Sequence, residues 1–329
     1  MPPPSSAYSP ARWLPGGHAM TVFANFARVF PRPRACRERV ELPDGDFVDL
    51  DRYAGPSPDA AVVLVCHGLE GHSRTPYVRG LVAVALARGF AAAALNFRGC
   101  SGVPNRLPRL YHSGDTGDLD AVVHLLAAER PGRAILLAGF SLGGNVVAKY
   151  LGERGDRLPP EVRAGAVVSV PFDLAASARA LDGPGLMMRV YRTRFLRRLR
   201  RKALAKARRF PGRIDAAAAA SARSFAAFDD GVTAPVHGFA SAEDYWARSS
   251  SGRYLAGVRR PLLAIAAEDD PMVPRASLPV DAARANPAVT LEITPAGGHV
   301  AFVSGWPLWP SYWADRRAVE FLASAPGGG

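Results

Sequence analysis

Short apolar runs alternate along much of this chain with stretches in which apolar residues recur at helical spacing. Six runs have the continuous hydrophobicity of strands buried on both faces, namely residues 61–66, 90–95, 134–138, 164–170, 261–266 and 289–293. Helical spacing is found over residues 78–88, 118–130, 144–151 and 312–322. Because strands and helices alternate from residue 61 to 170, we predict a mostly parallel central sheet with helices on both faces.

The region before residue 61 has a different pattern. Residues 38–42 and 47–53 alternate between polar and apolar positions on either side of a turn that contains Pro43 and Gly45, which predicts a β-hairpin. We expect residues 1–37 to form an N-terminal arm packed on the core, and residues 38–329 to form one domain.

The alternation also stops between the fourth and fifth predicted buried strands. No strand pattern comparable to the earlier ones is found from residue 171 to 260. We therefore expect an inserted helical lid at about residues 172–260, over the carboxyl edge of the sheet.

Positive charge is concentrated in this interval. The chain has 41 Lys and Arg residues against 29 Asp and Glu, and residues 189–213 contain ten arginines and two lysines with no acidic residue. The same segment carries apolar residues that would give its helix an apolar side: Val190, Phe195, Leu196, Leu199 and Leu204. We interpret it as a solvated face of the lid. Contact with an anionic membrane surface is the next alternative, and no nucleic-acid partner is expected.

The cysteines and the first residues of the chain bear on the cellular compartment in which the protein is expected. Cys36, Cys66 and Cys100 cannot all pair with one another and show no C-x-x-C spacing, which fits a reducing, intracellular setting. The first residues lack a basic stretch followed by an apolar one, and no apolar run has the length of a membrane span. We expect a cytoplasmic protein, with attachment to a membrane surface left open and the oligomeric state unspecified.

Two glycine-rich turns follow predicted strands and carry candidate chemistry. In the sequence GFSLG at residues 139–143, the glycines allow a sharp turn from strand to helix that exposes the hydroxyl of Ser141. The backbone N–H of Leu142 would stabilise an oxyanion from the helix N-terminus. In HGLEG at residues 67–71, the N–H of Leu69 is the candidate second donor, and His67 is expected to brace its turn.

Two further residues complete a candidate catalytic set. Asp270 and His299 each follow a predicted strand, so the fold would bring both to the sheet edge that carries Ser141. A serine hydroxyl needs a general base such as His299, and the histidine needs a carboxylate to fix its tautomer. Asp269 competes with Asp270, with capping of the strand-exit turn as its alternative role. His112 and Asp115 lack a third metal ligand nearby, and we interpret them as loop-fixing contacts.

The chain resembles the YheT-like branch of α/β-hydrolases, the AB-hydrolase 4 family, which is related to abhydrolase-domain lipases and fungal ethyl-ester acyltransferases. The motifs are WLPGGH (13–18), HGLEG (67–71), NFRGCSG (96–102), YHSGD (111–115), GFSLGGN (139–145), SVPFDL (169–174), DDP (269–271) and GGH (297–299). The resemblance implies an α/β-hydrolase fold and an esterase or lipase in which Ser141, Asp270 and His299 form the charge relay. Trp246 departs from the tyrosine that is more frequent in the family, which bears on the fit of the substrate.

These observations predict a serine hydrolase that cleaves carboxylic esters, including lipid esters such as acylglycerols, through an acyl-enzyme. No metal and no organic cofactor are expected. An alternative is an acyltransferase, in which an alcohol takes the acyl group from the same acyl-enzyme. An alternative from another class is a non-catalytic binding module that uses the basic segment, although a binder needs neither the three candidate catalytic residues nor both glycine turns.

Overall fold

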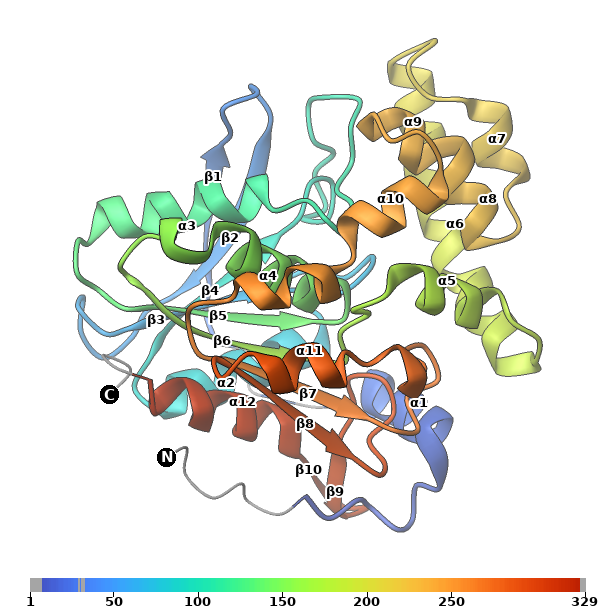
Figure 1. Ribbon diagram of the computed structural model, residues 1–329. Coiled ribbons are helices and arrows are strands. Elements are labelled where there is room, and N and C mark those ends of the chain that lie inside the picture. The colour runs from blue at the N-terminus through green and yellow to red at the C-terminus, as the bar shows by residue number, and fades with distance from the viewer. Residues whose placement is uncertain (1–7, 29, 31–32, 326–329) are drawn as a thin grey trace.

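The computed structural model describes residues 8–28, 30 and 33–325 of the chain. Its main feature is an eight-stranded sheet with the order β1-β2-β4-β3-β5-β6-β7-β8 (Figure 1). The strands are β1 (Cys36–Glu41), β2 (Phe47–Tyr53), β3 (Val62–Cys66), β4 (Ala91–Asn96), β5 (Ile135–Phe140), β6 (Val162–Val168), β7 (Leu262–Ala267) and β8 (Val289–Thr294). The β1–β2 and β2–β4 pairs are antiparallel, and the other five pairs are parallel. The predicted hairpin and the predicted mostly parallel sheet are therefore confirmed.

Helices cover both faces of this sheet, as predicted. One face carries α3 (Gly117–Glu129), α4 (Leu142–Arg154) and α11 (Val280–Ala285), and the other carries α2 (Pro76–Ala87) and α12 (Trp313–Ala323). Neighbouring residues of one strand alternate between the two cores, so that Leu64 packs with the first set of helices and Val63 with the second. Short 3₁₀ turns lie at Gly155–Arg157, Ser251–Gly257 and Arg275–Ser277.

α11 was not predicted from the sequence, nor were a helix near the N-terminus and a short hairpin before α12. α1 (Gly16–Ala27) begins with two glycines, which are poor helix formers, so the local pattern does not indicate a helix. It is held by packing, because Met20 and Ala24 are buried against Ala301 and the β9–β10 hairpin. The strands of that hairpin, β9 (Val303–Trp306) and β10 (Trp309–Tyr312), have four residues each, which is too short for a clear alternation.

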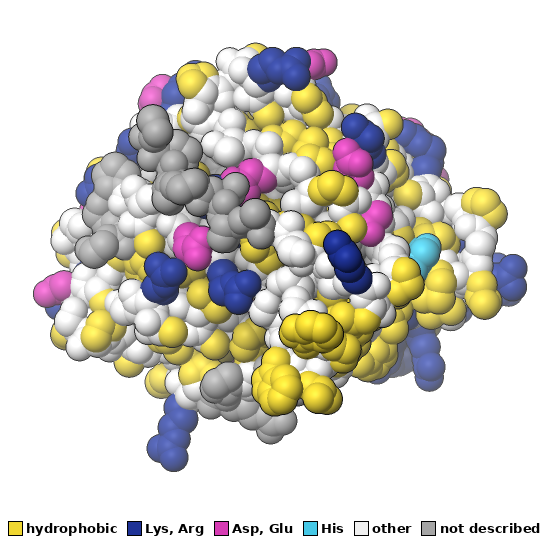
Figure 2. Space-filling model, turned by 90° about the horizontal axis from the view of Figure 1, so that it is seen from below, with side chains coloured by type: hydrophobic (Ala, Val, Ile, Leu, Met, Phe, Trp, Pro, Cys, Tyr) yellow, Lys and Arg dark blue, Asp and Glu magenta, His cyan; other side chains and the backbone are white. Residues whose placement is uncertain are grey.

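The β9–β10 hairpin also exposes apolar surface. Trp306, Leu308 and Trp309 are largely exposed. Figure 2 looks at the molecule from below and shows hydrophobic side chains gathered on the face that carries this hairpin.

The segment between β6 and β7 is helical and extends away from the sheet (Figure 1). It contains α5 (Leu174–Asp182), α6 (Leu186–Arg209), α7 (Ala216–Ser221), α8 (Phe225–Phe228), a π-helical turn (Asp229–Thr233), α9 (Ala234–His237) and α10 (Ala242–Ser249). We call residues 172–260 the helical insertion. α6 holds most of the basic segment. Its predicted apolar side is confirmed for Leu196, Leu199 and Leu204, which pack with Ile214 and Phe228 in a small separate core, whereas the prediction was wrong for Val190, which is exposed.

α1, in the N-terminal part of the chain, packs on the core through Met20 and Ala24, whereas residues 1–7, 29, 31 and 32 of the expected arm lie outside the described residues. β1 begins at Cys36, just inside the range expected for the arm. The division into an arm of residues 1–37 and a domain of residues 38–329 stays a prediction. Among the residues that the structure describes, no helix is both long enough and apolar enough to cross a membrane.

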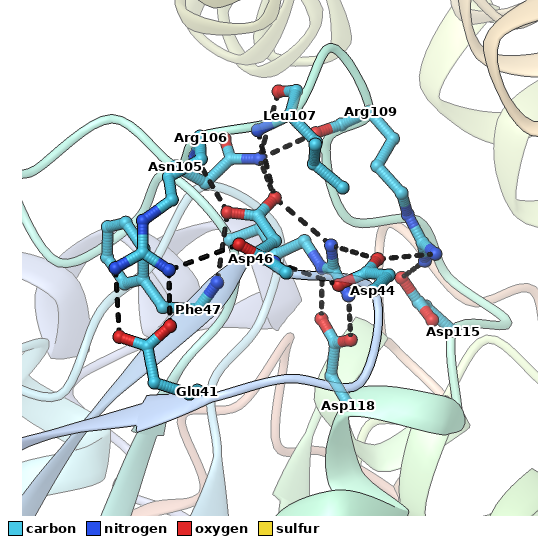
Figure 3. A network of polar contacts seen from close by, with 12 residues as sticks. Glu41, Asp44, Asp46, Phe47, Asn105, Arg106, Leu107, Arg109, Asp115 and Asp118 are labelled. Carbon is cyan, nitrogen blue, oxygen red and sulfur yellow. Dashed lines mark hydrogen bonds and ion pairs between the residues drawn. The ribbon is translucent and has the colours of Figure 1, made fainter.

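A buried ionic network fixes the loop after β4 (Figure 3). The guanidinium of Arg98 donates to both carboxylate oxygens of Asp118, at 2.6 and 2.8 Å, to Asp44 at 2.7 Å and to Asp46 at 3.1 Å. Asp46 is fully buried, and it also accepts hydrogen bonds from the side chain of Asn105 and from backbone N–H groups. The network therefore ties the β1–β2 turn, α3 and the loop of residues 97–116 into one unit.

This loop in turn holds the helical insertion. The ammonium of Lys206 on α6 donates to the carbonyl oxygens of Asn105, at 2.7 Å, and of Leu107. Arg209 donates to the same Asn105 carbonyl at 3.3 Å. The C-terminal half of α6 is thus attached to a loop that the buried network makes rigid.

We predict that Arg98→Met lowers the free energy of unfolding by about 3–5 kcal/mol, because it leaves the buried carboxylates of Asp46 and Asp118 without their cation. Urea denaturation followed by circular dichroism measures the change. The matched control is Arg106→Met, because Arg106 pairs with the exposed Glu41 and its loss should shift the unfolding midpoint far less. Equal losses of unfolding free energy in the two variants would contradict the conclusion that the buried network stabilises the fold.

Candidate active site

Ser141 lies on a strained turn between β5 and α4. Its backbone dihedrals are φ 51° and ψ −122°, a conformation that residues other than glycine rarely adopt. The flanking glycines are needed for space. A Cβ atom on Gly143 would lie 2.4 Å from the carbonyl oxygens of both Cys66 and His67, and one on Gly139 would lie 2.5 Å from that of Gly143. The positive φ therefore falls on the serine, and the two glycines supply the space around it, as the sequence predicted for a sharp turn.

The hydroxyl of Ser141 takes part in a chain of hydrogen bonds. Nε2 of His299 lies 2.9 Å from Oγ of Ser141, and Nδ1 of His299 lies 2.9 and 3.1 Å from the two carboxylate oxygens of Asp270. The carboxylate of Asp270 is buried and accepts further hydrogen bonds from the N–H groups of Met272 and Val273. The structure therefore brings together the three residues that the sequence singled out, from the ends of β5, β7 and β8.

The loop that carries His299 is held by residues that the sequence did not indicate. The N–H of His299 donates to the hydroxyl of Thr21 on α1 at 2.8 Å, and the N–H of Val300 donates to Ser169 at 2.9 Å. Asp269 accepts hydrogen bonds from the N–H groups of Gly297 and Gly298, both at 2.8 Å. Asp269 thus holds the histidine loop, where the sequence suggested a cap on the strand-exit turn.

Leu69, in the glycine turn after β3, and Leu142, at the start of α4, line the same pocket as Ser141. In the glycine turn after β3, the N–H of Gly68 donates to Tyr77 and that of Glu70 donates to Tyr111. Among the described residues, no group accepts a hydrogen bond from the N–H of Leu69, which lies between them, or from that of Leu142. Leu69 and Leu142 line one pocket with Ser141, which makes their N–H groups available to a ligand oxygen.

The helical insertion contacts this glycine turn directly. Glu70 has a positive φ of 55°, and its buried carboxylate accepts hydrogen bonds from Tyr111 at 3.0 Å and from Lys202 on α6 at 2.8 Å. Arg198, one turn earlier on α6, donates to the backbone carbonyl of Glu70 at 3.2 Å. The conformation of the turn that carries Leu69 therefore depends on α6.

The pocket in front of Ser141 has a volume of about 870 Å³. Residues of the helical insertion supply much of its apolar lining, among them Leu174, Phe225, Phe228 and Trp246. Asp229 also lines it, and burial raises the pKa of this carboxyl to about 6. Trp246 donates to Asp229 at 2.8 Å, so the residue that departs from the family pattern helps to shape the pocket.

The other polar candidates have structural contacts. Nδ1 of His112 accepts from the N–H of Gly114, and Asp115 pairs with Arg109 at 2.7 Å, which confirms them as loop-fixing residues. Cys66 is buried at the end of β3. No cluster of His, Cys, Asp and Glu residues that could hold a metal ion occurs within the described ranges.

Comparison with known proteins gives consistent similarities. Residues 61–305 match the model of a family described as having the alpha/beta hydrolase fold. The chain is 36% identical to the Escherichia coli (strain K12) protein named "Putative esterase YheT", over 97% of this chain and 94% of that protein. It is 30% identical to phospholipase ABHD3 of Mus musculus, over 97% and 78%, and 34% identical to the monoacylglycerol lipase of Saccharomyces cerevisiae, over 88% and 67%.

Solved structures agree on the fold at low sequence identity. A structure of the Pyrococcus furiosus esterase Pf2001 superposes with a TM-score of 0.60 at 18% identity, over 91% of this chain and 96% of that one. The Est1E protein of Butyrivibrio proteoclasticus, solved with bound ferulic acid, gives a TM-score of 0.51 at 14% identity, over 80% and 90%.

We predict that His67 stays neutral throughout the pH range in which most histidines titrate. Its Nδ1 lies 2.7 Å from the carbonyl oxygen of Gly68 and its Nε2 accepts from the N–H of Phe97, which confirms it as a brace of its turn. Burial lowers the pKa of His67 to about 3. Long-range ¹H–¹⁵N NMR, with the signal assigned by comparison with His67→Gln, should show a neutral ring protonated at Nδ1 from pH 8 down to pH 5. Titration of this ring between pH 5 and 8 would contradict the assignment.

Proposed function

The chain belongs to the alpha/beta hydrolase family, as its resemblance to YheT-like members implies, and on this premise we propose a serine hydrolase that cleaves carboxylic esters. The observation that carries the proposal is the continuous set of hydrogen bonds from Ser141 through His299 to Asp270, at the wall of a large apolar pocket. Relatives named phospholipase and monoacylglycerol lipase support hydrolysis of lipid esters over transfer to an alcohol.

In the first half of the reaction, Oγ of Ser141 attacks the ester carbonyl and gives its proton to Nε2 of His299. The carboxylate of Asp270 accepts from Nδ1 of His299, which keeps Nε2 free to take the proton and stabilises the imidazolium that forms. The protonated histidine then passes its proton to the departing alcohol. The product of this half-reaction is an acyl group bound to Ser141.

Negative charge develops on the carbonyl oxygen during this step. The N–H groups of Leu69 and Leu142 are the donors assigned to it, because both line the pocket beside Ser141 and neither is used elsewhere among the described residues. Donors that are fixed before the reaction stabilise such charge without any cost of reorganisation. The N–H of Leu142 also has the favourable field of the α4 N-terminus.

In the second half, water attacks the acyl group, with His299 as general base, and Ser141 is released. The apolar lining supplied by the helical insertion suits an acyl chain. We infer that the insertion acts as a lid that limits access of water to the pocket, which fits its position between β6 and β7.

Removing the nucleophile should abolish activity. Ser141→Ala is expected to lower kcat for p-nitrophenyl esters of C4 to C8 acids by at least about 10³-fold. The thermal unfolding midpoint serves as the control and should change little, because the hydroxyl bonds to His299 alone among the described residues. Residual activity within tenfold of the unaltered protein would show that another residue is the nucleophile.

The two adjacent aspartates should behave differently. Asp270→Asn is expected to lower kcat by about 10³- to 10⁴-fold, because the amide favours the wrong tautomer of His299. Asp269→Asn keeps an oxygen for the N–H groups of Gly297 and Gly298 and should affect mainly stability. Steady-state kinetics and thermal melts of both variants make the comparison. If Asp269→Asn lowers kcat more than Asp270→Asn does, then Asp269 is the partner of His299 and Asp270 has the supporting role.

A further inference from the structure

About half of the basic residues of α6 are engaged by the protein itself. Lys202 pairs with Glu70, and Lys206, Arg192, Arg200 and Arg209 donate to backbone carbonyl oxygens. These contacts account for part of the charge of residues 189–213 without any ligand. Arg198 also donates to the backbone carbonyl of Glu70, although its side chain is exposed.

Five arginines form an exposed face of α6. Arg194, Arg197, Arg198 and Arg201 recur at spacings of three and four residues, and Arg189 lies five residues before Arg194. All five line a shallow groove together with Val190 and Thr193. None of the five pairs with a carboxylate among the residues that the structure describes. Like charges at this spacing repel one another on a helix, so the arrangement lowers stability unless an anion joins it.

The groove opens onto the pocket of Ser141. Val190, Arg194 and Arg198 belong to the lining of both, and Arg74 lines the pocket from the loop before α2. His72 lies among these cations: partial burial and the charges of Arg198 and Arg74 lower its pKa. Burial and the charge of Arg198 likewise lower the pKa of Arg194. The pocket therefore has an apolar interior and a cationic entrance.

We propose that this entrance binds an anionic group of the substrate, so that the preferred substrates are esters whose alcohol part carries a phosphate or carboxylate. This inference rests on the proposed ester hydrolysis. An acyl chain in the apolar interior leaves the alcohol part toward the entrance, where the lining includes the exposed residues Arg74, Arg194 and Arg198. Guanidinium groups bind carboxylate and phosphate oxygens through paired hydrogen bonds, which a single ammonium cannot reproduce.

The anionic group has two sources, a dissolved ester and the head group of a lipid at a membrane surface. Two exposed apolar residues belong to this region: Phe26 lines the pocket and is 76% exposed, and Leu186, the first residue of α6, is 74% exposed. They are compatible with contact between residues 189–213 and an anionic membrane surface, the alternative to a solvated face, which stays untested. The chemistry at the entrance is the same for both sources, so the experiment has to separate them.

The test uses two fluorogenic esters that differ by one carboxylate, the butyrates of 7-hydroxycoumarin and of 7-hydroxycoumarin-3-carboxylate. Arg74→Gln/Arg194→Gln should lower kcat/KM for the carboxylate ester on the order of tenfold more than for the neutral ester. The preference should also weaken as salt concentration rises. The matched control, Arg208→Gln/Arg213→Gln, removes two exposed arginines of the same segment outside the groove and should change neither value.

A binding measurement separates failure of this proposal from failure of the proposed function. Ser141→Ala should bind 7-hydroxycoumarin-3-carboxylate more tightly than 7-hydroxycoumarin in fluorescence polarisation, and the added Arg74→Gln/Arg194→Gln changes should remove the difference. Equal binding of the two compounds, or equal kinetic losses for the two esters, overturns the anionic substrate. If the unaltered protein hydrolyses neither ester but still binds the carboxylate compound selectively, the proposed esterase activity is wrong and the proposed anion site is supported.

Vesicles then distinguish the source of the anion. Binding to a lipid head group predicts that the protein co-sediments with phosphatidylglycerol vesicles and not with phosphatidylcholine vesicles. This co-sedimentation should be lost in the variant Arg189→Gln/Arg194→Gln/Arg197→Gln/Arg201→Gln. Selectivity for the carboxylate ester without vesicle binding assigns the anionic group to a dissolved ester. Both results support an anionic substrate.

Discussion

The site depends on the close approach of two backbone segments, the first turn of α4 and the end of β3. Gly143 has no room for a side chain, because the carbonyl oxygens of Cys66 and His67 occupy the space of its Cβ. This approach places Ser141 beside the glycine turn that carries Leu69. The strain at Ser141, with its positive φ, is tolerated because the buried strand β5 before it and the buried helix α4 after it fix the ends of the turn.

The helical insertion contributes more than a cover for the pocket. Through Lys202 and Arg198, α6 holds the side chain and the backbone of Glu70, next to one proposed oxyanion donor. Through Lys206, the same helix is attached to the loop fixed by the buried network of Arg98. A charged helix that would look like a solvated face in isolation therefore has one side engaged in positioning the turn and another side exposed at the pocket entrance.

The sequence was sufficient to predict the sheet, the helices on its faces and the residues that meet at its carboxyl edge. Those predictions rest on local signals, such as continuous apolar runs and the GFSLG turn, which the fold preserves. The supporting contacts could not be predicted, because they join distant positions without a local pattern. Thr21 reaches the N–H of His299, and Tyr77 and Tyr111 occupy the donors on either side of Leu69. The partners of the basic segment are mostly backbone carbonyl oxygens, which no sequence motif marks.

The most direct test of this account is a crystal structure of the protein after reaction with a fluorophosphonate ester. We expect phosphorus bonded to Oγ of Ser141, with the phosphonyl oxygen about 2.7–3.1 Å from the backbone nitrogens of Leu69 and Leu142. An adduct on another residue, or a phosphonyl oxygen directed away from both nitrogens, would contradict the assignment of the nucleophile or of the oxyanion donors.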